Sequence, residues 1–484
     1  MSDESSNSNI ISQFIEDFGF YTLAEFIPAA LGLVSLVIYT RIFSTIAYGQ
    51  YSLTIVFVTV VSTAVFGWLE QAVLRFESDS KKVVPVAITI LVLISGIILT
   101  IGVVLFVFFG GYLRSYRTFY LAAVAATIGI GAFRVLKSVF QAQLKSKQVS
   151  LYSLLKAVLK LSIGIVLSIY IFDNIVGWIW GSAIGSIIAV LVMLIKIDID
   201  ELTVSSNTAR RLVWYGLPMV GWLFGLTLLT FADRALIELL STTSDVGIYS
   251  SNYSLVQTGL PLVLSPVIQT LHPIIMDKWD GENHETVSSL IAEYSRYYLI
   301  LGVAATIFAG IISRPLSRTV LGESFQSGFI IIPIIGVSLF LWNLAMIGHK
   351  GLELYESTGI MTGGVILAVT SNIVLNIFLI PPYEYVGAAF ATVLSSGIYV
   401  GFAYVMSRKT VSWTIPRNTI IRVFFAGSIM SSIGYFGYIS NLSDIFLCLV
   451  GIIGGIIYFL VLLAFGEFRS GEVVRVRKML NAII

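Results

Sequence analysis

The chain has 484 residues, of which 57% are hydrophobic and only 12% are charged, and its formal net charge is +2. Because soluble domains carry about 25% charged residues, this composition excludes an ordinary soluble protein and indicates one that lies within a membrane. The single cysteine, Cys448, excludes an intramolecular disulfide and any metal site built from several cysteines.

Fourteen apolar runs are long enough to cross a hydrocarbon core, which takes about 20 helical residues. The longest segments between them, 196–211 and 277–289, are too short to form a catalytic domain. The pattern predicts an all-α polytopic membrane protein with about 14 transmembrane helices. The approximate centres of the runs are Gly32, Thr63, Ser95, Ile128, Leu161, Ser186, Phe224, Gly259, Thr306, Leu339, Ala368, Ser396, Ile429 and Gly454.

Basic residues predict the orientation of these helices. The first eighteen residues, "MSDESSNSNIISQFIEDF", are polar and acidic, and they lack the basic stretch and cleavage site of a signal peptide. With this segment in the cytoplasm, the inner side holds nineteen of the 29 Lys and Arg residues. We therefore predict a cell-membrane protein with both termini cytoplasmic, and the net charge needs no nucleic-acid partner. The outer side then holds only Arg41, Arg114, Arg117, Arg314 and Arg318.

Two pairs of short motifs recur at similar offsets. "AYGQYSL" (47–53) and "DVGIYSSNYSL" (245–255) follow the first and seventh runs, and their glycines, Gly49 and Gly247, are 198 residues apart. Val-Gly also opens the sixth and twelfth runs, where Gly177 and Gly387 are 210 residues apart. The offsets predict two six-helix lobes related by an axis along the membrane normal, with two further helices. The predicted segments are 1–18, lobes 19–200 and 201–410, helices 13 and 14 in 411–466, and a cytoplasmic tail 467–484 that forms an amphipathic helix.

Three segments, in chain order, resemble polysaccharide-biosynthesis flippases. "IPAALGLVSLVIYTRIFSTIAYGQYSL" (27–53) is similar to the opening hairpin of that family, and 217–276 contains a long helix ending in Asp-Arg before a Val-Gly-x-Tyr turn. Residues 371–409 contain Asn-x-x-x-Asn, a proline turn and Gly-Ala-Ala-x-Ala-Thr. These flippases belong to the multidrug/oligosaccharidyl-lipid/polysaccharide superfamily, which includes MATE exporters and lipid II flippases.

The resemblance implies a V-shaped, MATE-like pair of lobes whose central cleft opens alternately to each side of the membrane. It implies export of an oligosaccharide on a polyprenyl phosphate or pyrophosphate carrier, with membrane lipids and the glycosyltransferases and polymerase of the same pathway as partners. No cofactor is implied beyond a coupling Na⁺ or H⁺.

Cations within the apolar runs are the candidate substrate ligands, because a charge at membrane depth needs a functional or structural reason. Lys156 and Lys160 in "LLKAVLKLSIG" stand four apart on one helix face, where they repel unless an anion or water faces them. The alternative is that they snorkel to the interface.

Three arginines extend this set, because a guanidinium can hold a phosphate through two hydrogen bonds. Arg134 in "GAFRVLKS" is expected near the inner end of its helix, where simple anchoring is the alternative. Arg41 lies near the outer end of the first run, where it either binds the headgroup or forms a surface ion pair. Arg234 occupies the corresponding place in the second half.

Acidic residues are candidates for ion coupling or gating. Glu25 falls one turn before Pro28, where free backbone groups and a carboxylate could bind Na⁺ or H⁺. Glu70 in "GWLEQAV" is a second candidate, and either could instead be the structural partner of Arg75 or another basic group. In "TFADRALIELL" (230–240), Arg234 and Glu238 are four apart and share one helix face, and Asp233 points about 100° away from it. Asp233 therefore needs another partner. That partner lies either at an outer gate or in a structural ion network.

Two further expectations concern single side chains. We expect Trp178 and Trp180 in the aromatic belt at the membrane interface. We also expect an ion pair between Glu293 and Arg296, which are three residues apart.

Three other functions are weaker interpretations. A MATE-like exporter of cationic drugs or metabolites favours acidic cavities, whereas the cations here favour an anionic substrate. A glycan polymerase or ligase needs a sizeable outer loop, and the largest one, "SRPLSRTVLGESFQ" (313–326), is short. A structural scaffold has no use for unpaired charges in lipid.

Overall fold

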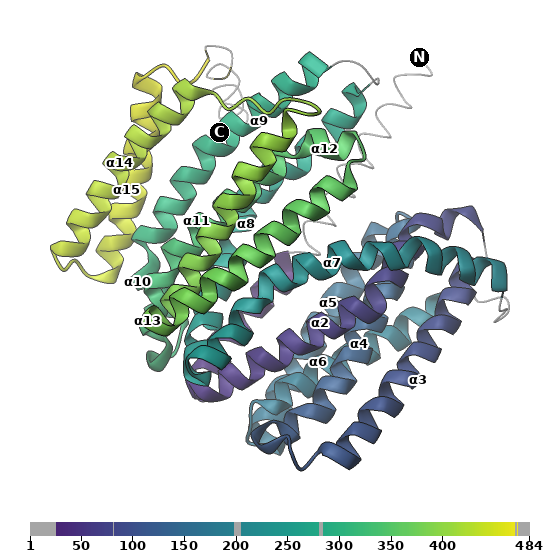
Figure 1. Ribbon diagram of the computed structural model, residues 1–484. Coiled ribbons are helices and arrows are strands. Elements are labelled where there is room, and N and C mark those ends of the chain that lie inside the picture. The colour runs from purple at the N-terminus through teal and green to yellow at the C-terminus, as the bar shows by residue number, and fades with distance from the viewer. Residues whose placement is uncertain (1–25, 81, 198–204, 280–283, 470–471, 473–484) are drawn as a thin grey trace, which may run out of the picture. The chain divides into compact units, whose positions relative to one another are not determined.

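The computed structural model (Figure 1) describes residues 26–80, 82–197, 205–279, 284–469 and 472, and every regular element in these ranges is a helix. Twelve helices are long and apolar enough to cross a membrane, and Phe26–Ile42 is a shorter apolar helix. One of the twelve, α13 (Thr358–Ser407), consists of two helices joined by a kink, where Glu384 has a φ of 51° after Pro381 and Pro382. All predicted apolar runs fall on these helices, so the predicted all-α membrane fold is confirmed.

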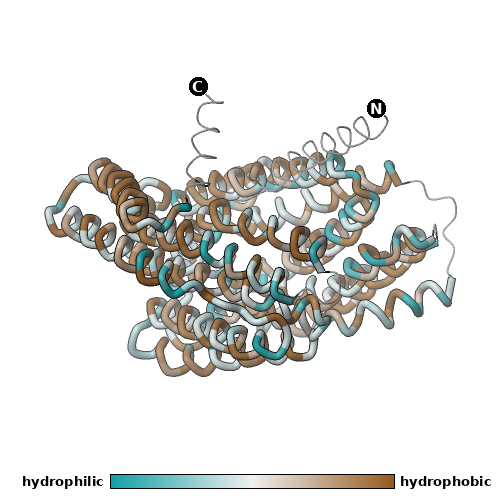
Figure 2. The backbone as a smooth tube through the Cα atoms, turned by 90° about the horizontal axis from the view of Figure 1, so that it is seen from above, coloured by the Kyte–Doolittle hydropathy of each residue, from teal (hydrophilic) through white to brown (hydrophobic). Residues whose placement is uncertain are grey.

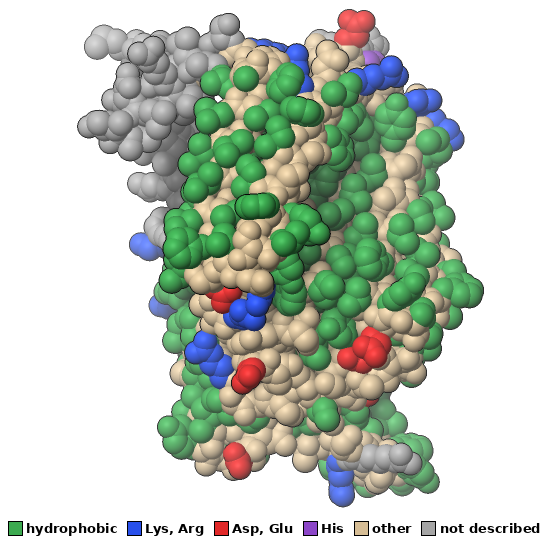
Figure 3. Space-filling model, turned by 90° about the vertical axis from the view of Figure 1, so that its left-hand side faces the viewer, with side chains coloured by type: hydrophobic (Ala, Val, Ile, Leu, Met, Phe, Trp, Pro, Cys, Tyr) green, Lys and Arg blue, Asp and Glu red, His purple; other side chains and the backbone are tan. Residues whose placement is uncertain are grey.

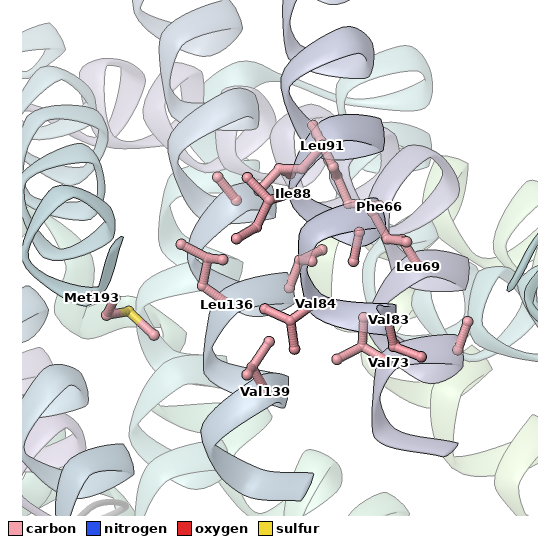
Figure 4. Close-up of a cluster of buried hydrophobic side chains, with 14 of the residues drawn as sticks. Phe66, Leu69, Val73, Val83, Val84, Ile88, Leu91, Leu136, Val139 and Met193 are labelled. Atoms are coloured by element: carbon pink, nitrogen blue, oxygen red, sulfur yellow. The ribbon is translucent and has the colours of Figure 1, made fainter. Parts of the chain in front are cut away.

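The first of two compact units comprises residues Met1–Ser250. Within it α2 packs along α4 and α7, and α6 packs along both α4 and α5. Their common core contains Phe66, Leu69, Ile88, Leu136 and Met193 from α2, α3, α4 and α6 (Figure 4). The predicted lobe boundary at 200 and 201 stays a prediction. The helices after Phe26–Ile42 are α2 (Thr45–Phe76), α3 (Val83–Phe109), α4 (Arg117–Ala142), α5 (Ser146–Val166) with a π-helix (Leu167–Ile171), α6 (Val176–Lys196), α7 (Ser206–Leu240) and the start of α8 (Thr243–Lys278).

The second unit comprises residues Ser251–Ile484. Its α11 packs against α9 and the long α13, while α14 packs against α15 and α9. Buried Ile300, Val423, Met430 and Tyr458 join α9, α14 and α15 in one apolar cluster. After α8, its described helices are α9 (His284–Ile311), α10 (Ser313–Val320), a 3-10 helix (Glu323–Ile330), α11 (Ile331–Gly348), α12 (Lys350–Leu354), α13, α14 (Arg417–Ile439) and α15 (Asp444–Ala464).

Apolar side chains cover the outside of many of these helices. Val107 and Phe108 on α3 are 71% and 72% exposed, a placement that suits hydrocarbon and not water. Hydrophobic residues predominate along the helices in Figure 2, and apolar side chains predominate on the face in Figure 3. The surface therefore agrees with a multi-pass membrane protein.

A buried ion network ties the segment after α15 to α9. Arg296, 6% exposed, pairs through Nε with Glu467 at 2.8 Å and through Nη1 with Glu472 at 2.8 Å. The expected pair of Arg296 with Glu293 is therefore wrong, because Glu293 pairs with Arg469 at 3.3 Å. Tertiary packing therefore determines which carboxylates pair with Arg296, and the spacing of residues along α9 does not.

The same network keeps Glu472 ionised. Hydrogen bonds from Arg296 lower the pKa of Glu472 from 4.5 to about 2, although burial opposes the shift. The contribution of this carboxylate to stability is accordingly complete above pH 4.5 and is lost as the pH falls through about 2.

Replacing Arg296 with Met should lower the thermal midpoint of the detergent-purified full chain. The change removes one of the two arginines that pair with Glu467, which is 3% exposed, and leaves only Arg422 at 3.0 Å; breaking a buried pair costs up to about 3–5 kcal/mol. Arg469→Met is the matched control, because Arg469 is 66% exposed and a surface pair contributes about 0–1 kcal/mol. Equal shifts in the two variants would contradict this interpretation of the network.

Candidate functional site

Glycines on α6 fix the position of α5 in the first unit. Gly177, Gly181 and Gly185 recur every four residues and so line one face of α6. A Cβ on Gly185 would lie 2.9 Å from the backbone nitrogen of Lys160, and one on Gly181 would collide with the backbone of Gly164. Only glycine permits this approach, so the α6 backbone sets where Lys160 sits.

Lys156 and Lys160 lie near the middle of the span that α5 and the π-helix form, Ser146–Ile171. At 1.5 Å per residue they stand about 15 Å and 21 Å beyond Ser146. The helix begins at Ser146, so neither lysine lies in its first turn.

Each lysine contacts an aromatic ring, and no carboxylate pairs with either of them within the described part of the chain. The Nζ of Lys156 lies 4.2 Å from the ring centroid of Phe133, and that of Lys160 lies 5.4 Å from the centroid of Trp178. Such contacts stabilise a cation without neutralising it. Lys137 and Arg134 are close enough to Lys156 to add to the positive potential.

Trp178 forms the centre of a stacked aromatic cluster. It lies between Tyr39 and Tyr51, with centroids 3.8 Å and 4.4 Å away and interplanar angles of 8° and 2°. It is only 4% exposed, so the prediction that it belongs to an interfacial belt is wrong. The sequence did not predict the contact of Trp178 with Lys160, although the neighbouring Gly177 indicates close packing at this position.

Arg134 and Glu70 are brought together between α4 and α2. Nη2 of Arg134 lies 2.7 Å from Oε2 of Glu70, and Nη1 donates to Oγ1 of Thr63 at 3.0 Å. Thr63 belongs to the middle of α2, so the guanidinium lies deeper than the expected inner helix end. The ion pair gives Glu70 the structural partner that the sequence left open, and this partner is Arg134.

The charges of "TFADRALIELL" lie at the end of α7, against the first turns of α8. Asp233 and Arg234 are 1% and 4% exposed, and Tyr249 donates its hydroxyl to Asp233 at 2.8 Å. The guanidinium of Arg234 donates to the Thr230 carbonyl at 2.7 Å. Glu238 accepts a hydrogen bond from Thr243 at 2.9 Å. The partner that Asp233 required is therefore a tyrosine on α8.

The two repeat glycines meet where α2 and α8 begin. A Cβ on Gly49 would collide with the Thr243 carbonyl, and one on Gly247 would collide with the Thr45 carbonyl. The hydroxyls of Ser52 and Ser250, which are 198 residues apart, hydrogen-bond at 2.7 Å. The repeat found in the sequence thus marks a reciprocal helix crossing.

Of the two remaining predicted site residues, the structure describes only Arg41. Arg41 is exposed at the last turn of the helix Phe26–Ile42. Glu25, the segment 1–18 and residues 473–484 of the tail lie outside the described residues. Among the residues that the structure does describe, no group of three His, Cys, Asp or Glu could hold a metal ion.

Solved structures define the class of this fold. The lipid II flippase MurJ in its inward closed conformation superposes with a TM-score of 0.77 at 16% identity, covering 92% of this chain and 99% of MurJ. An inward-facing MATE multidrug transporter gives a TM-score of 0.61 at 12% identity over 81% of this chain and 93% of the transporter. The chain therefore shares the fold of MurJ and of this MATE transporter.

Within that class the family is defined by sequence. Residues 14–279 match the family described as polysaccharide biosynthesis protein, and the chain belongs to it. It is 24% identical over 216 residues to the probable low-salt glycan biosynthesis flippase Agl15 of Haloferax volcanii, covering 44% of this chain and 45% of that relative. It is 22% identical over 397 residues to the probable flippase AglR of the same organism, covering 80% and 81% of the two chains.

Exchanging the charges of Glu70 and Arg134 tests whether this pair is structural. Glu70→Gln alone should lower the thermal midpoint, because an unsatisfied partner in a partly buried site costs about 1–3 kcal/mol. The double variant Glu70→Arg with Arg134→Glu should recover most of that loss. A double variant no more stable than the single ones would show that Glu70 and Arg134 do not stabilise the fold as a pair.

Proposed function

We propose that the protein is a flippase for a lipid-linked oligosaccharide. It moves the glycan on its polyprenyl phosphate or pyrophosphate carrier from the inner to the outer leaflet of the cell membrane by alternating access. The product supplies cell-surface polysaccharide or glycoprotein glycan synthesis, and membrane lipids and the glycosyltransferases and polymerase of that pathway are its partners. Family membership and the likeness to named flippases support this proposal.

The observation that carries the proposal is the uncompensated lysine pair on α5. A lysine at the centre of a membrane span costs about 2.5–3.5 kcal/mol on insertion scales, and two on one helix face also repel each other. Phe133 and Trp178 hold the two ammonium groups in place without cancelling their charge. A phosphate or pyrophosphate supplies the missing anion.

The remaining candidate residues have different proposed roles, because their charges have different partners in the structure. Arg134 already pairs with Glu70, so it adds positive potential beside Lys156 and does not offer a vacant guanidinium. Arg234 and Arg41 contact the headgroup at later stages, on the outer side of the proposed orientation. Glu25 is the candidate for coupling to Na⁺ or H⁺, and Glu70 and Asp233, which already have partners, are the candidates for gating.

The charge pattern favours this function over a MATE-like exporter of cations. A cationic substrate needs carboxylates left free to receive it, whereas Glu70 pairs with Arg134 and Asp233 accepts from Tyr249. A polymerase or ligase needs room for catalytic groups outside the membrane. The segment 313–326 instead folds compactly into α10 and the start of a 3-10 helix.

Neutralising Lys160 should reduce transport and leave the protein folded. Removing a charge-assisted contact with phosphate weakens binding by about tenfold or more, so Lys160→Gln lowers flipping accordingly. Lys160→Arg should keep part of the flipping activity. Lys160→Glu should have the lowest activity, because it places a negative charge where the anionic headgroup binds. The measurement is outward transfer of lipid-linked oligosaccharide in liposomes, with and without Na⁺ or H⁺ gradients.

Lys147→Gln is the matched control, because Lys147 is exposed in the first turn of the same helix. It should transport like the original chain at equal reconstitution. Normal transport by a Lys156→Gln and Lys160→Gln double variant would remove the substrate site from α5. Transport of cationic dyes, with no glycolipid transferred, would instead support the MATE-like function.

The proposed orientation places both termini in the cytoplasm. In a Cys448→Ser background, single cysteines at Ser2 and Ile484 should react with a membrane-impermeant maleimide only after the cells are opened. Labelling of either position in intact cells would reverse the assignment of inner and outer sides.

A further inference from the structure

An apolar groove lies on the second unit, whereas the lysine pair belongs to the first unit. It runs between α9, α11 and α14 and has a volume of about 380 Å³. Ile307, Ile311, Phe329, Pro333 and Val337 supply its apolar walls. All three helices are membrane spans, so a ligand that reaches this groove comes from the bilayer.

The groove has a cationic end. Arg314 in α10 lines it and is half-buried, and its guanidinium carbon lies 5.8 Å from the ring centroid of Tyr438. No ion pair joins Arg314 to a carboxylate in the part of the chain that the structure describes, whereas nearby Arg318 pairs with Asp444 at 3.5 Å. Ser313 places a hydroxyl beside this end. A half-buried cation beside an apolar groove complements a ligand that is anionic at one end and apolar along its length.

The length of the groove fits one leaflet. Ser431 and Tyr438 both line it on α14 and are seven residues apart, a helical rise of about 10 Å. Half of the hydrocarbon core is about 15 Å thick. Tyr435, which is 67% exposed, lies along the same groove, so a chain can enter sideways from the lipid.

We propose that this groove binds an anionic phospholipid of the bilayer, with one acyl chain along α9 and α14 and the phosphate on Arg314. In the proposed orientation the lipid belongs to the outer leaflet. The guanidinium donates two hydrogen bonds to the phosphate, while the apolar walls replace contacts that the chain would make with other lipids. The site is independent of the lysine pair, and its test needs no transport.

Native mass spectrometry of the full chain in detergent tests this site with two lipids that have the same acyl chains and headgroups of different net charge. Added phosphatidylglycerol should be retained as one tight adduct, and phosphatidylcholine with the same chains should be lost. Arg314→Gln should weaken phosphatidylglycerol binding by about tenfold or more, and Arg314→Lys by less. Val337→Trp should also abolish the adduct with Arg314 intact, because Val337 is 38% exposed and the larger ring fills the groove.

Arg318→Gln is the matched control. Arg318 lies one turn along α10 and is already paired with Asp444, so this variant should retain the lipid like the original chain. Equal retention by the Arg314→Gln and Arg318→Gln variants overturns the proposal. Equal retention of phosphatidylcholine, which has the phosphate but no net charge, overturns the selectivity for an anionic headgroup, and displacement of phosphatidylglycerol by equimolar polyprenyl phosphate overturns phospholipid as the occupant.

Discussion

The high cost of an isolated charge in hydrocarbon is the constraint on which this structure depends. The charged residues buried in its spans mostly have partners that reduce this cost. Arg134 pairs with Glu70, Asp233 accepts from Tyr249, and Arg296 pairs with Glu467. Lys156 and Lys160 differ, because aromatic rings and no carboxylate face them in the described chain. A structural role leaves this difference unexplained, whereas an anionic substrate accounts for it.

Helix packing turns the lysine pair into a defined site. The α6 glycines bring two backbones into contact at Lys160 and Gly164, and this contact leaves α5 little freedom to slide or rotate. Trp178, held between Tyr39 and Tyr51, supports the same region from α6. The groups proposed to bind the substrate are thus carried on a rigid scaffold, as preorganised binding requires.

The second unit uses its charges differently. Arg296, Glu467 and Glu472 satisfy one another and fasten the end of the chain to α9. Arg314 has no such carboxylate partner within the described residues and lies at an apolar groove. In the proposed function one unit presents cations to the cargo, and in the proposed lipid site the other unit presents a cation at a helix end to a phospholipid.

The sequence by itself determined the membrane fold and its apolar runs, because the preference of each side chain for lipid is a local property that sums along a helix. It also identified Gly49 and Gly247, since a repeated turn and helix start leave a repeated motif. Only the tertiary structure decided that Glu70 pairs with Arg134, that Glu467 displaces Glu293 from Arg296, and that Trp178 is buried. These outcomes depend on which helix faces meet across long separations in the chain, and helical spacing within one segment carries no information about such contacts.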